Sequence, residues 1–441
     1  MQASSLICRL TLFNPVWTKE GKGRCRGNGI RTVLAEVDSP PTVYEGLVLF
    51  GSRDGYVYAL HAADGQLVWR FRAAPVDQRL VAYGQLESVW PVHGSVLIQD
   101  GVLYCAAGRS MFLDGGLRLL RLDPKTGRLL SETVLDDRDP RTGKELQEYV
   151  SWLNMPPALP DILSSDGRYV YMRSQAFRLD GTRLPLERMP TGADADRGAP
   201  PATQRVDRAH LFSPTGFLDD SWWHRTYWLY GSTFVSGWCG YFRAGKAAPA
   251  GRILVFDDEK IYGFGRKPKF YRWTTPIEHE LFAADRLPPE ASRSPEGRPG
   301  GGPYLVSRHW AEELPFLARA IVLAGRTLFV AGPPDLVDEE QAFKQVQGPT
   351  ARQQLAQQEA ALAGRQGGVL WAVDPADGSK RAQYQLDSPP RFDGLIAAAG
   401  RLYMTCADGR VLCLAGRQVA ERPGPGPAAL GPRVEPTRPA R

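Results

Sequence analysis

The hydrophobic and polar positions of this chain follow the same short pattern near both of its ends. Segments 46–60 (GLVLFGSRDGYVYAL) and 400–414 (GRLYMTCADGRVLCL) each hold a run of β-forming residues, an Asp-Gly pair, and a second run of alternating character. This pattern predicts a β-hairpin with a tight turn. A hairpin that recurs at a long interval predicts a repeat architecture.

Weaker copies of the pattern lie between these two segments. Besides Gly46 and Gly400, four further strand openings begin at the following residues: Gly101, Gly167, Glu259 and Gly325. Three turns, ending at Gly65, Gly127 and Gly378, also share one frame. The glycine supplies the positive φ that a tight turn between strands needs. The steps between the openings are uneven, which predicts that insertions separate the repeats.

One copy carries a fuller motif. The segment 59–69 (ALHAADGQLVW) resembles the tryptophan-docking repeat of the pyrroloquinoline-quinone (PQQ)-type β-propellers, whose pattern is Ala-x-Asp-x-x-Thr-Gly-x-x-x-Trp. The resemblance implies that Trp69 packs between neighbouring blades as a buried structural ring, with Gly55 and Gly65 in the adjoining turns. At the tryptophan position, the second and fifth copies hold Ser131 and Ala382. The predicted fold is an all-β propeller of four-stranded PQQ-like blades, about six of them recognisable and six to eight in total.

The predicted propeller spans residues 30–415. Residues 1–29 do not resemble a repeat and are expected to be poorly ordered. Residues 416–441, rich in Pro, Gly, Ala and Arg, are expected to be a disordered tail. The strand predicted at Ile30–Val37 is the candidate to complete the last blade, which shows three strands at most. Without that closure, the chain is an arc of a larger propeller.

Two insertions interrupt the predicted repeats. The insertion 338–367 contains Thr350–Leu362, whose strong helix formers predict one short exposed helix with Thr350 as its N-cap. The insertion 210–250 is aromatic and holds four of the eleven tryptophans. The acidic run Asp257–Glu259 is interpreted as a turn between strands rather than as a metal site.

Charge, cysteines and hydropathy narrow the possible roles. Lys and Arg number 54 against 48 Asp and Glu, a small excess that predicts no nucleic-acid partner. No run approaches the length of a transmembrane segment, so a soluble protein is expected. Residues 4–13 form a poor secretory signal, whereas the family resemblance implies a periplasmic or extracellular protein. Cys406 and Cys413 fall on adjacent predicted strands, where a disulfide and two free thiols both fit.

The resemblance also raises an oxidoreductase as the alternative function. Dehydrogenases of this family hold PQQ in a central funnel against a Trp, often with a disulfide between adjacent cysteines. They bind Ca²⁺ through Glu and Asn and use an Asp base. This chain has no adjacent cysteines, and no acid–amide set in it matches that pattern. We therefore expect no enzyme activity, no catalytic or metal-binding residue, and neither PQQ nor Ca²⁺ as cofactor.

The aromatic insertion is the candidate binding surface. Aromatic and arginine side chains are enriched at binding hot spots, and aromatic faces also stack on sugars and cations. The candidate residues are Trp222, Trp223, His224, Arg225, Tyr227, Trp228, Trp238 and Tyr241. The competing interpretation is that these rings only pack the insertion onto a blade. The predicted function is a non-enzymatic scaffold that binds a protein or glycan partner. The resemblance implies a role similar to that of the family's outer-membrane-protein assembly lipoprotein, which uses such a propeller to hold partner proteins.

Overall fold

The computed structural model describes most of the chain between residues 9 and 415. The described residues are 9–16, 24–32, 37, 39, 41–82, 85–146, 158–160, 162–173, 175–185, 209–212, 228–231, 249–266, 279–286, 306–338, 342, 348–398 and 400–415. No helix among them is long and apolar enough to cross a membrane.

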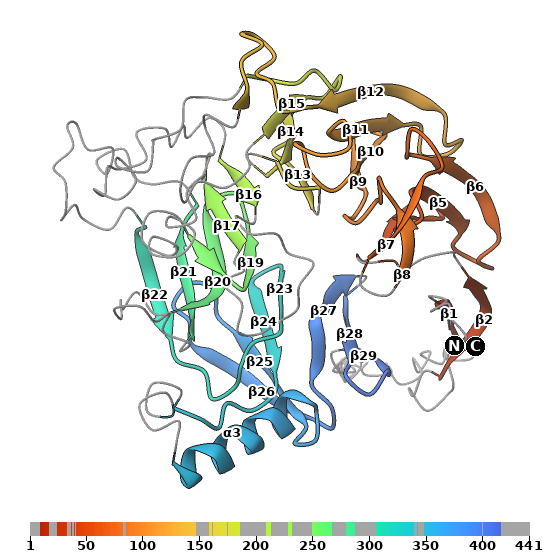
Figure 1. Cartoon of the computed structure of the whole chain (residues 1–441). Helices are drawn as coiled ribbons and strands as arrows, with labels where there is room; N and C mark the ends of the chain where they lie inside the picture. Colours follow the sequence, from red (N-terminus) through yellow and green to blue (C-terminus); the bar gives the residue numbers. More distant parts are fainter. Residues whose placement is uncertain are drawn as a thin grey trace, which may run out of the picture.

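Most described residues belong to seven successive antiparallel sheets, named blades one to seven in chain order (Figure 1). Blades one and two consist of β3 (Thr42–Tyr44), β4 (Leu47–Gly51), β5 (Tyr56–His61) and β6 (Leu67–Arg72), and of β9 (Leu97–Gln99), β10 (Val102–Ala107), β11 (Leu117–Leu122) and β12 (Leu129–Leu135). Blades three and four consist of β13 (Leu163–Ser165), β14 (Tyr169–Met172) and β15 (Gln175–Arg178), and of β16 (His210–Phe212), β17 (Trp228–Gly231) and β18 (Ala250–Gly251).

The remaining three blades follow the same meander. Blade five consists of β19 (Ile253–Phe256), β20 (Lys260–Arg266), β21 (His279–Asp285) and β22 (Arg308–Glu312). Blade six consists of β23 (Ala320–Ala324), β24 (Thr327–Gly332), β25 (Gly368–Val373) and β26 (Lys380–Leu386). Blade seven consists of β27 (Pro390–Ala398), β28 (Arg401–Cys406) and β29 (Val411–Ala415).

The blades are arranged around a ring, and the labelled first strands β9, β13, β16, β23 and β27 lie toward its centre (Figure 1). Successive first strands contact one another: β3 contacts β9, β9 contacts β13, β13 contacts β16, β19 contacts β23, and β23 contacts β27. Within each blade, every strand pairs with the next strand in the sequence. The predicted all-β propeller is therefore confirmed, with seven blades in the described part of the chain.

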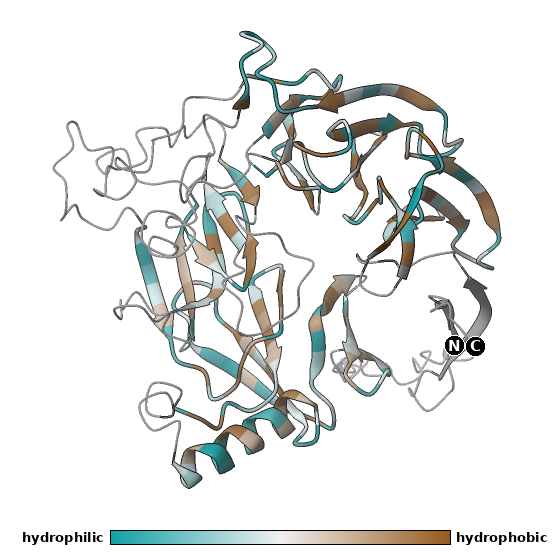
Figure 2. Ribbon diagram, in the orientation of Figure 1, coloured by the Kyte–Doolittle hydropathy of each residue, from teal (hydrophilic) through white to brown (hydrophobic). Residues whose placement is uncertain are grey.

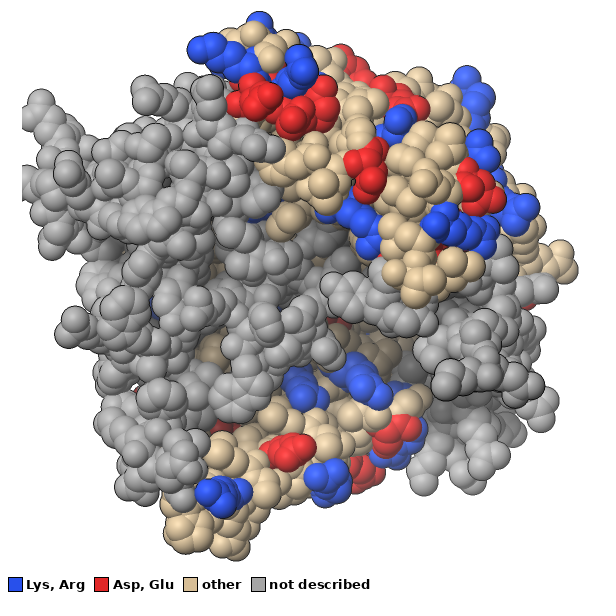
Figure 3. Space-filling view, viewed as in Figure 1, with Lys and Arg blue, Asp and Glu red and all other residues tan. Residues whose placement is uncertain are grey.

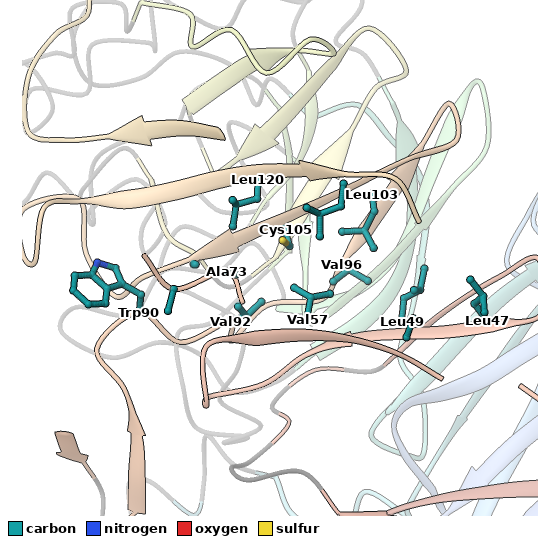
Figure 4. Close-up of a cluster of buried hydrophobic side chains, with 14 of the residues drawn as sticks. Leu47, Leu49, Val57, Ala73, Trp90, Val92, Val96, Leu103, Cys105 and Leu120 are labelled. Carbon is teal, nitrogen blue, oxygen red and sulfur yellow. The ribbon is translucent and has the colours of Figure 1, made fainter. Parts of the chain in front are cut away.

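Alternating side chains pack each blade against its neighbours. Between blades one and two, Leu49 and Val57 of the first blade share a buried cluster with Leu103 and Leu120 of the second (Figure 4). Successive side chains of a strand point to opposite faces, so one apolar set faces each neighbouring blade. Hydrophobic residues accordingly recur along the strands of all seven blades (Figure 2).

Residues 210–250 were expected to form an aromatic insertion, but parts of this segment form blade four. Three short strands of this segment, β16, β17 and β18, form a sheet of the ring instead of an insertion outside the repeats. The strands are only three, four and two residues long. Strands this short leave little alternation to detect, and no Asp-Gly pair marks their turns.

The structure describes only parts of the two chain ends, so the expectations for them stay predictions. Within the segment expected to be poorly ordered, β1 (Arg9–Val16) and β2 (Arg24–Thr32) pair as an antiparallel hairpin. This hairpin pairs segments close in sequence, so it needs no repeat frame and a search for repeats overlooks it. The closing strand Ile30–Val37 is described only in part, and β2 pairs only with β1 among the described strands. The tail 416–441 lies outside the described residues.

The predicted helix is confirmed as α3 (Pro349–Leu362), but its N-cap is Gly348 rather than Thr350. Proline is favoured at the first helical position because its φ is already helical and the N–H it lacks would have no partner there. Pro349 therefore starts the helix two residues earlier than the side-chain capping rule predicts. The other predicted local feature, the turn at Asp257–Glu259, is present between β19 and β20. There the Asp257 Oδ1 accepts hydrogen bonds from the backbone N–H groups of Glu259 and Lys260.

Candidate binding surface

Trp69 anchors blade one to blade two. It lies in β6 opposite Ala59, and its ring covers Gly127 in the turn before β12. A Cβ atom at Gly127 would lie 2.7 Å from the indole, so the contact requires glycine. The indole Nε1–H donates a hydrogen bond to the Pro124 carbonyl oxygen at 3.0 Å. The ring is half-buried, whereas the resemblance implied a buried ring.

Trp310 makes the same contact between blades five and six. It lies opposite Ala283 in the register that places Trp69 opposite Ala59. Its ring covers Gly378, and its Nε1–H donates to the Pro375 carbonyl oxygen at 3.0 Å. No Asp-Gly turn precedes Trp310 in the sequence, so the repeat frame gave no signal for it. Strand register alone reveals this second docking residue.

Between blades two and three, Ser131 occupies the tryptophan position. Polar contacts replace the contact that the indole makes at the other junctions. The Arg121 guanidinium donates to the Asp180 carbonyl oxygen at 3.0 Å, and the Thr133 hydroxyl donates to the Gly181 carbonyl oxygen at 2.7 Å. Docking onto the turn of the next blade is therefore common to three junctions, while the side chain that performs it differs.

The Asp54-Gly55 turn of blade one contacts a separate hairpin, which is formed by β7 (Arg79–Ala82) and β8 (Gln85–Ser88). Gly55 has a φ of +86°, and a Cβ atom there would lie 2.8 Å from the Ser88 hydroxyl. The Ser88 N–H donates to the Arg53 carbonyl oxygen at 2.8 Å. The other predicted structural glycine, Gly65, has a φ of +71° in its turn. Glycine at position 55 thus lets the hairpin approach the blade closely.

A buried carboxylate fixes this hairpin to blades one and two. Glu87 of β8 is only 1% exposed. Its Oε1 lies 2.5 Å from Arg109 Nη2, and its Oε2 lies 3.6 Å from Arg53 Nη1. Arg53 follows the second strand of blade one, and Arg109 follows the second strand of blade two. A charge is tolerated at such depth when it is paired, so these contacts hold the hairpin in one orientation.

The opposite face of the hairpin is apolar and exposed. Val81 and Leu86 are cross-strand partners, 74% and 55% exposed, and together they form what we call the hairpin surface. The neighbouring Leu80 points the other way and packs on the core between blades one and two. Within the described part of the chain, β7 and β8 pair only with each other. An exposed aliphatic pair on an anchored element makes this face of the hairpin a candidate protein-binding surface.

The predicted aromatic surface lies mostly outside the described residues. This holds for Trp222, Trp223, His224, Arg225, Tyr227, Trp238 and Tyr241. The exception, Trp228, begins β17 and lies opposite Gly251. It is half-buried and packs against a cluster that includes Tyr230 and Leu254. At this residue, the ring contributes to packing within the propeller.

Asp393 was not identified by any motif, yet it has an unusual environment. It lies in a bulge of β27 between Pro390 and Leu395, with a left-handed φ of +53°. Its N–H donates to the Arg319 carbonyl oxygen at 2.8 Å. Desolvation by the surrounding protein raises the pKa of this carboxyl to about 6, although the residue is exposed at the surface. The innermost strand of blade seven therefore carries a carboxyl group with a raised pKa.

The described part of the chain holds no group of three His, Cys, Asp or Glu side chains placed to bind a metal ion. Cys406 and Cys413 are both free, and Tyr403 rather than Cys406 lies opposite Cys413 in the sheet. Burial raises the pKa of the Cys406 thiol. On the face shown in Figure 3, basic and acidic side chains alternate over the described surface.

Comparison with known proteins supports the repeat family. Residues 16–182 match the family model described as outer membrane protein assembly factor BamB, which is less than half of the chain. No curated protein matches the chain. The prediction of a PQQ-like repeat protein is therefore confirmed, and the match includes blades one and two and the hairpin between them.

Solved structures resemble the chain only distantly. BamB from Moraxella catarrhalis is 13% identical, with a TM-score of 0.43, and the alignment covers 95% of this chain and 96% of that one. Quinohemoprotein alcohol dehydrogenase from Comamonas testosteroni is 12% identical, with a TM-score of 0.40, over 83% of this chain and 62% of that one.

Proposed function

We propose that this protein is a non-enzymatic scaffold that holds a partner protein through the hairpin surface. The observation that carries the proposal is the β7–β8 hairpin, which presents Val81 and Leu86 to solvent while Glu87 anchors it from beneath. Anchoring lowers the entropy lost when a partner binds, and the aliphatic pair supplies the apolar contact.

The family match supports this role. The matched proteins are described as outer membrane protein assembly factors, and the matched residues include the whole hairpin. We extend a role in protein assembly to this chain, which would hold a partner protein. The same description supports a location outside the cytoplasm, in the periplasm or beyond the cell. The proposed role requires no PQQ, Ca²⁺ or other cofactor.

Site-specific crosslinking in the native cell tests the proposal. A photoactivatable residue replaces Val81 or Leu86 in the tagged full-length chain, and we expect a discrete crosslinked partner at both positions. The control position is Lys125, an exposed residue in the turn between β11 and β12. Val81→Asp combined with Leu86→Asp should abolish capture of the same partner by the intact chain. Equal capture at Lys125, or no loss in the double variant, contradicts the assignment.

A separate experiment tests the absence of catalysis. The purified full-length chain is supplied with PQQ and Ca²⁺, and dye reduction is followed with alcohols and sugars as substrates. We expect neither saturable cofactor binding nor turnover. Saturable PQQ binding with substrate-dependent dye reduction would establish the dehydrogenase alternative in place of the scaffold.

A further inference from the structure

The β7–β8 hairpin carries a hydrogen-bonding edge beside the hairpin surface. In an antiparallel pair, opposed residues alternate between those that exchange hydrogen bonds and those whose N–H and C=O groups point away from the partner strand. The Ser88 N–H donates to the Arg53 carbonyl oxygen and not to β7. One residue further on, the Val89 N–H donates across the hairpin to the Gln78 carbonyl oxygen. Arg79 and Ser88 are therefore a pair whose backbone groups point outward.

The same alternation fixes the direction of the backbone at Val81. Val81 pairs with Leu86, two residues beyond the pair of Arg79 with Ser88, so its N–H and C=O groups also point outward. Arg79 and Val81 thus present their N–H and C=O groups along one side of β7. In the described part of the chain, no strand pairs with that side. We call this side of the strand the β7 edge.

The β7 edge lies in an exposed segment of an anchored hairpin. Val81 is 74% exposed, and Arg79 and residues 76–78 are exposed as well. On the other strand, Ser88 is buried and its N–H is already bonded to blade one. Glu87 holds the hairpin through its two arginine partners. A partner therefore meets a strand whose position is set before binding, which lowers the entropy lost on association.

The outer strands of the four-stranded blades are less suited to accept a further strand. In blades one, two, five and six, the pairing of the last strand is interrupted by a β-bulge, at Val68, Leu130, His309 and Arg381. A bulge distorts the edge on which an added strand has to pair. β7 pairs with β8 without a shift in register, and its four residues include no proline.

The side chains at the β7 edge favour an aliphatic strand. Directly opposed residues of an antiparallel pair lie on the same face, so a residue bonded to Val81 continues the exposed row formed by Leu86 and Val81. A parallel strand would instead place its bonded residues opposite Leu80, whose side chain packs on the core. The charge of Arg79 is matched locally, because its Nε donates to Asp77 Oδ1 at 3.1 Å.

From this geometry we infer that a partner protein adds an extended strand to the β7 edge, antiparallel to β7 and with aliphatic side chains at alternate positions. Outward N–H and C=O groups at strand spacing are matched by another extended backbone, whereas the backbone groups of a helix bond within the helix. The main-chain bonds supply affinity, and the side chain beside Val81 supplies specificity. The inference rests on the proposed function, since it specifies how the partner engages the hairpin surface.

Peptide binding to the full-length chain tests the inference. The probe is a labelled eight-residue peptide of alternating valine and threonine, N-methylated at each threonine so that only valine N–H groups remain free. The matched control carries the methyl groups on the valines, so its free edge places threonine beside Val81. We expect saturable binding of the probe and at least tenfold weaker binding of the control. Equal affinity for both peptides, or tighter binding of a helical leucine–glutamate peptide, overturns the inference.

A proline at position 79 removes one donor of the β7 edge and leaves Val81 and Leu86 in place. The Arg79 N–H points away from β8, so Arg79→Pro breaks no bond within the hairpin, and proline is tolerated at the first residue of a strand. Arg79→Ala is the matched control, because it removes the same side chain but keeps the N–H. We expect unchanged melting temperatures and at least tenfold weaker probe binding in the proline variant alone. Equal affinity in the two variants overturns the assignment.

Crosslinking separates this inference from the proposed function. In the native cell, a photoactivatable residue at Leu86 is combined with Arg79→Pro or with Arg79→Ala, and we expect capture of the partner to be lost only with proline. Equal capture in both variants overturns the strand and leaves the scaffold role standing. No capture in either variant contradicts the proposed function, while the peptide affinities still decide whether β7 accepts a strand. Capture of a second copy of this chain overturns the assignment of the strand to a partner protein.

Discussion

Single residues determine how one blade packs against the next. Trp69 and Trp310 each cover a glycine of the following blade and donate a hydrogen bond to the carbonyl oxygen of a proline in the same turn. An aromatic ring buries a large area, and its N–H finds a partner where a purely apolar ring would leave the carbonyl unpaired. Half-burial of Trp69 limits the stabilisation to the lower part of the range for core tryptophans.

Trp69→Ala should lower the free energy of unfolding by about 3 kcal/mol, because it removes ring burial and one hydrogen bond together. Gly127→Ala should also destabilise, since its methyl group would collide with the indole. Chemical denaturation measures both. Val43→Ala, at an exposed position of blade one, is the control and should change stability by less than about 0.5 kcal/mol. A loss at Trp69 no larger than that control would rule out a docking role.

Asp393 should make stability depend on pH in a recognisable direction. Its pKa is raised to about 6 in the folded chain, above the usual value of 3.8, so the folded state binds the proton more tightly. Its contribution to stability is therefore fully present below about pH 4 and is lost as pH rises through about 6. Asp393→Asn keeps a residue that tolerates left-handed backbone and removes the titration.

The measurement for Asp393 is the stability difference between wild type and Asp393→Asn across pH. We expect the variant to gain relative to wild type as pH rises from 4 to 7. Asp100→Asn, another exposed aspartate with left-handed backbone, controls for the loss of a charge. A difference that stays flat with pH, or that changes in the same way for Asp100, contradicts the assignment.

At the scale of elements, the β7–β8 hairpin depends on one buried carboxylate, that of Glu87, and its two arginine partners. Glu87→Gln removes the charge that two arginines share, and breaking a buried pair costs about 3–5 kcal/mol when the partners stay behind. Hydrogen exchange should accelerate first in residues 79–88, because Glu87 is the anchor of that hairpin. Glu132→Gln, which breaks the more exposed pair with Arg118, should cost no more than about 1 kcal/mol. Uniform acceleration across all blades would show that the pair does not anchor the hairpin locally.

The elements differ in how far the sequence revealed them. Blades with an Asp-Gly pair and a glycine-ended turn were predictable, because these residues enforce turns locally. Helix α3 was equally clear from its helix formers. Blade four and Trp310 were not, because their turns lack that chemistry and only pairing with neighbouring strands defines them. The anchor of Glu87 joins residues from three elements, and no local pattern reports such a contact.

At the scale of the whole molecule, the docking tryptophans act at separate junctions of the ring. Trp69 joins blades one and two, whereas Trp310 joins blades five and six, and they share no partner. Distant mutations without shared contacts usually add. The double variant Trp69→Ala with Trp310→Ala should therefore lose the sum of the single losses, within about 0.5 kcal/mol. A loss well above the sum would show that the ring transmits strain between distant blades.

The sequence by itself determined the repeat, the class of fold and the principal docking tryptophan. These follow from strand alternation and turn glycines, which act over a few residues and so remain visible in one dimension. Tertiary structure alone decided the seventh sheet, the second docking tryptophan and the hairpin surface. Each of these depends on which strands lie side by side. The correspondence between Trp69 and Trp310 appears only when strand register aligns blades that the sequence separates by 241 positions.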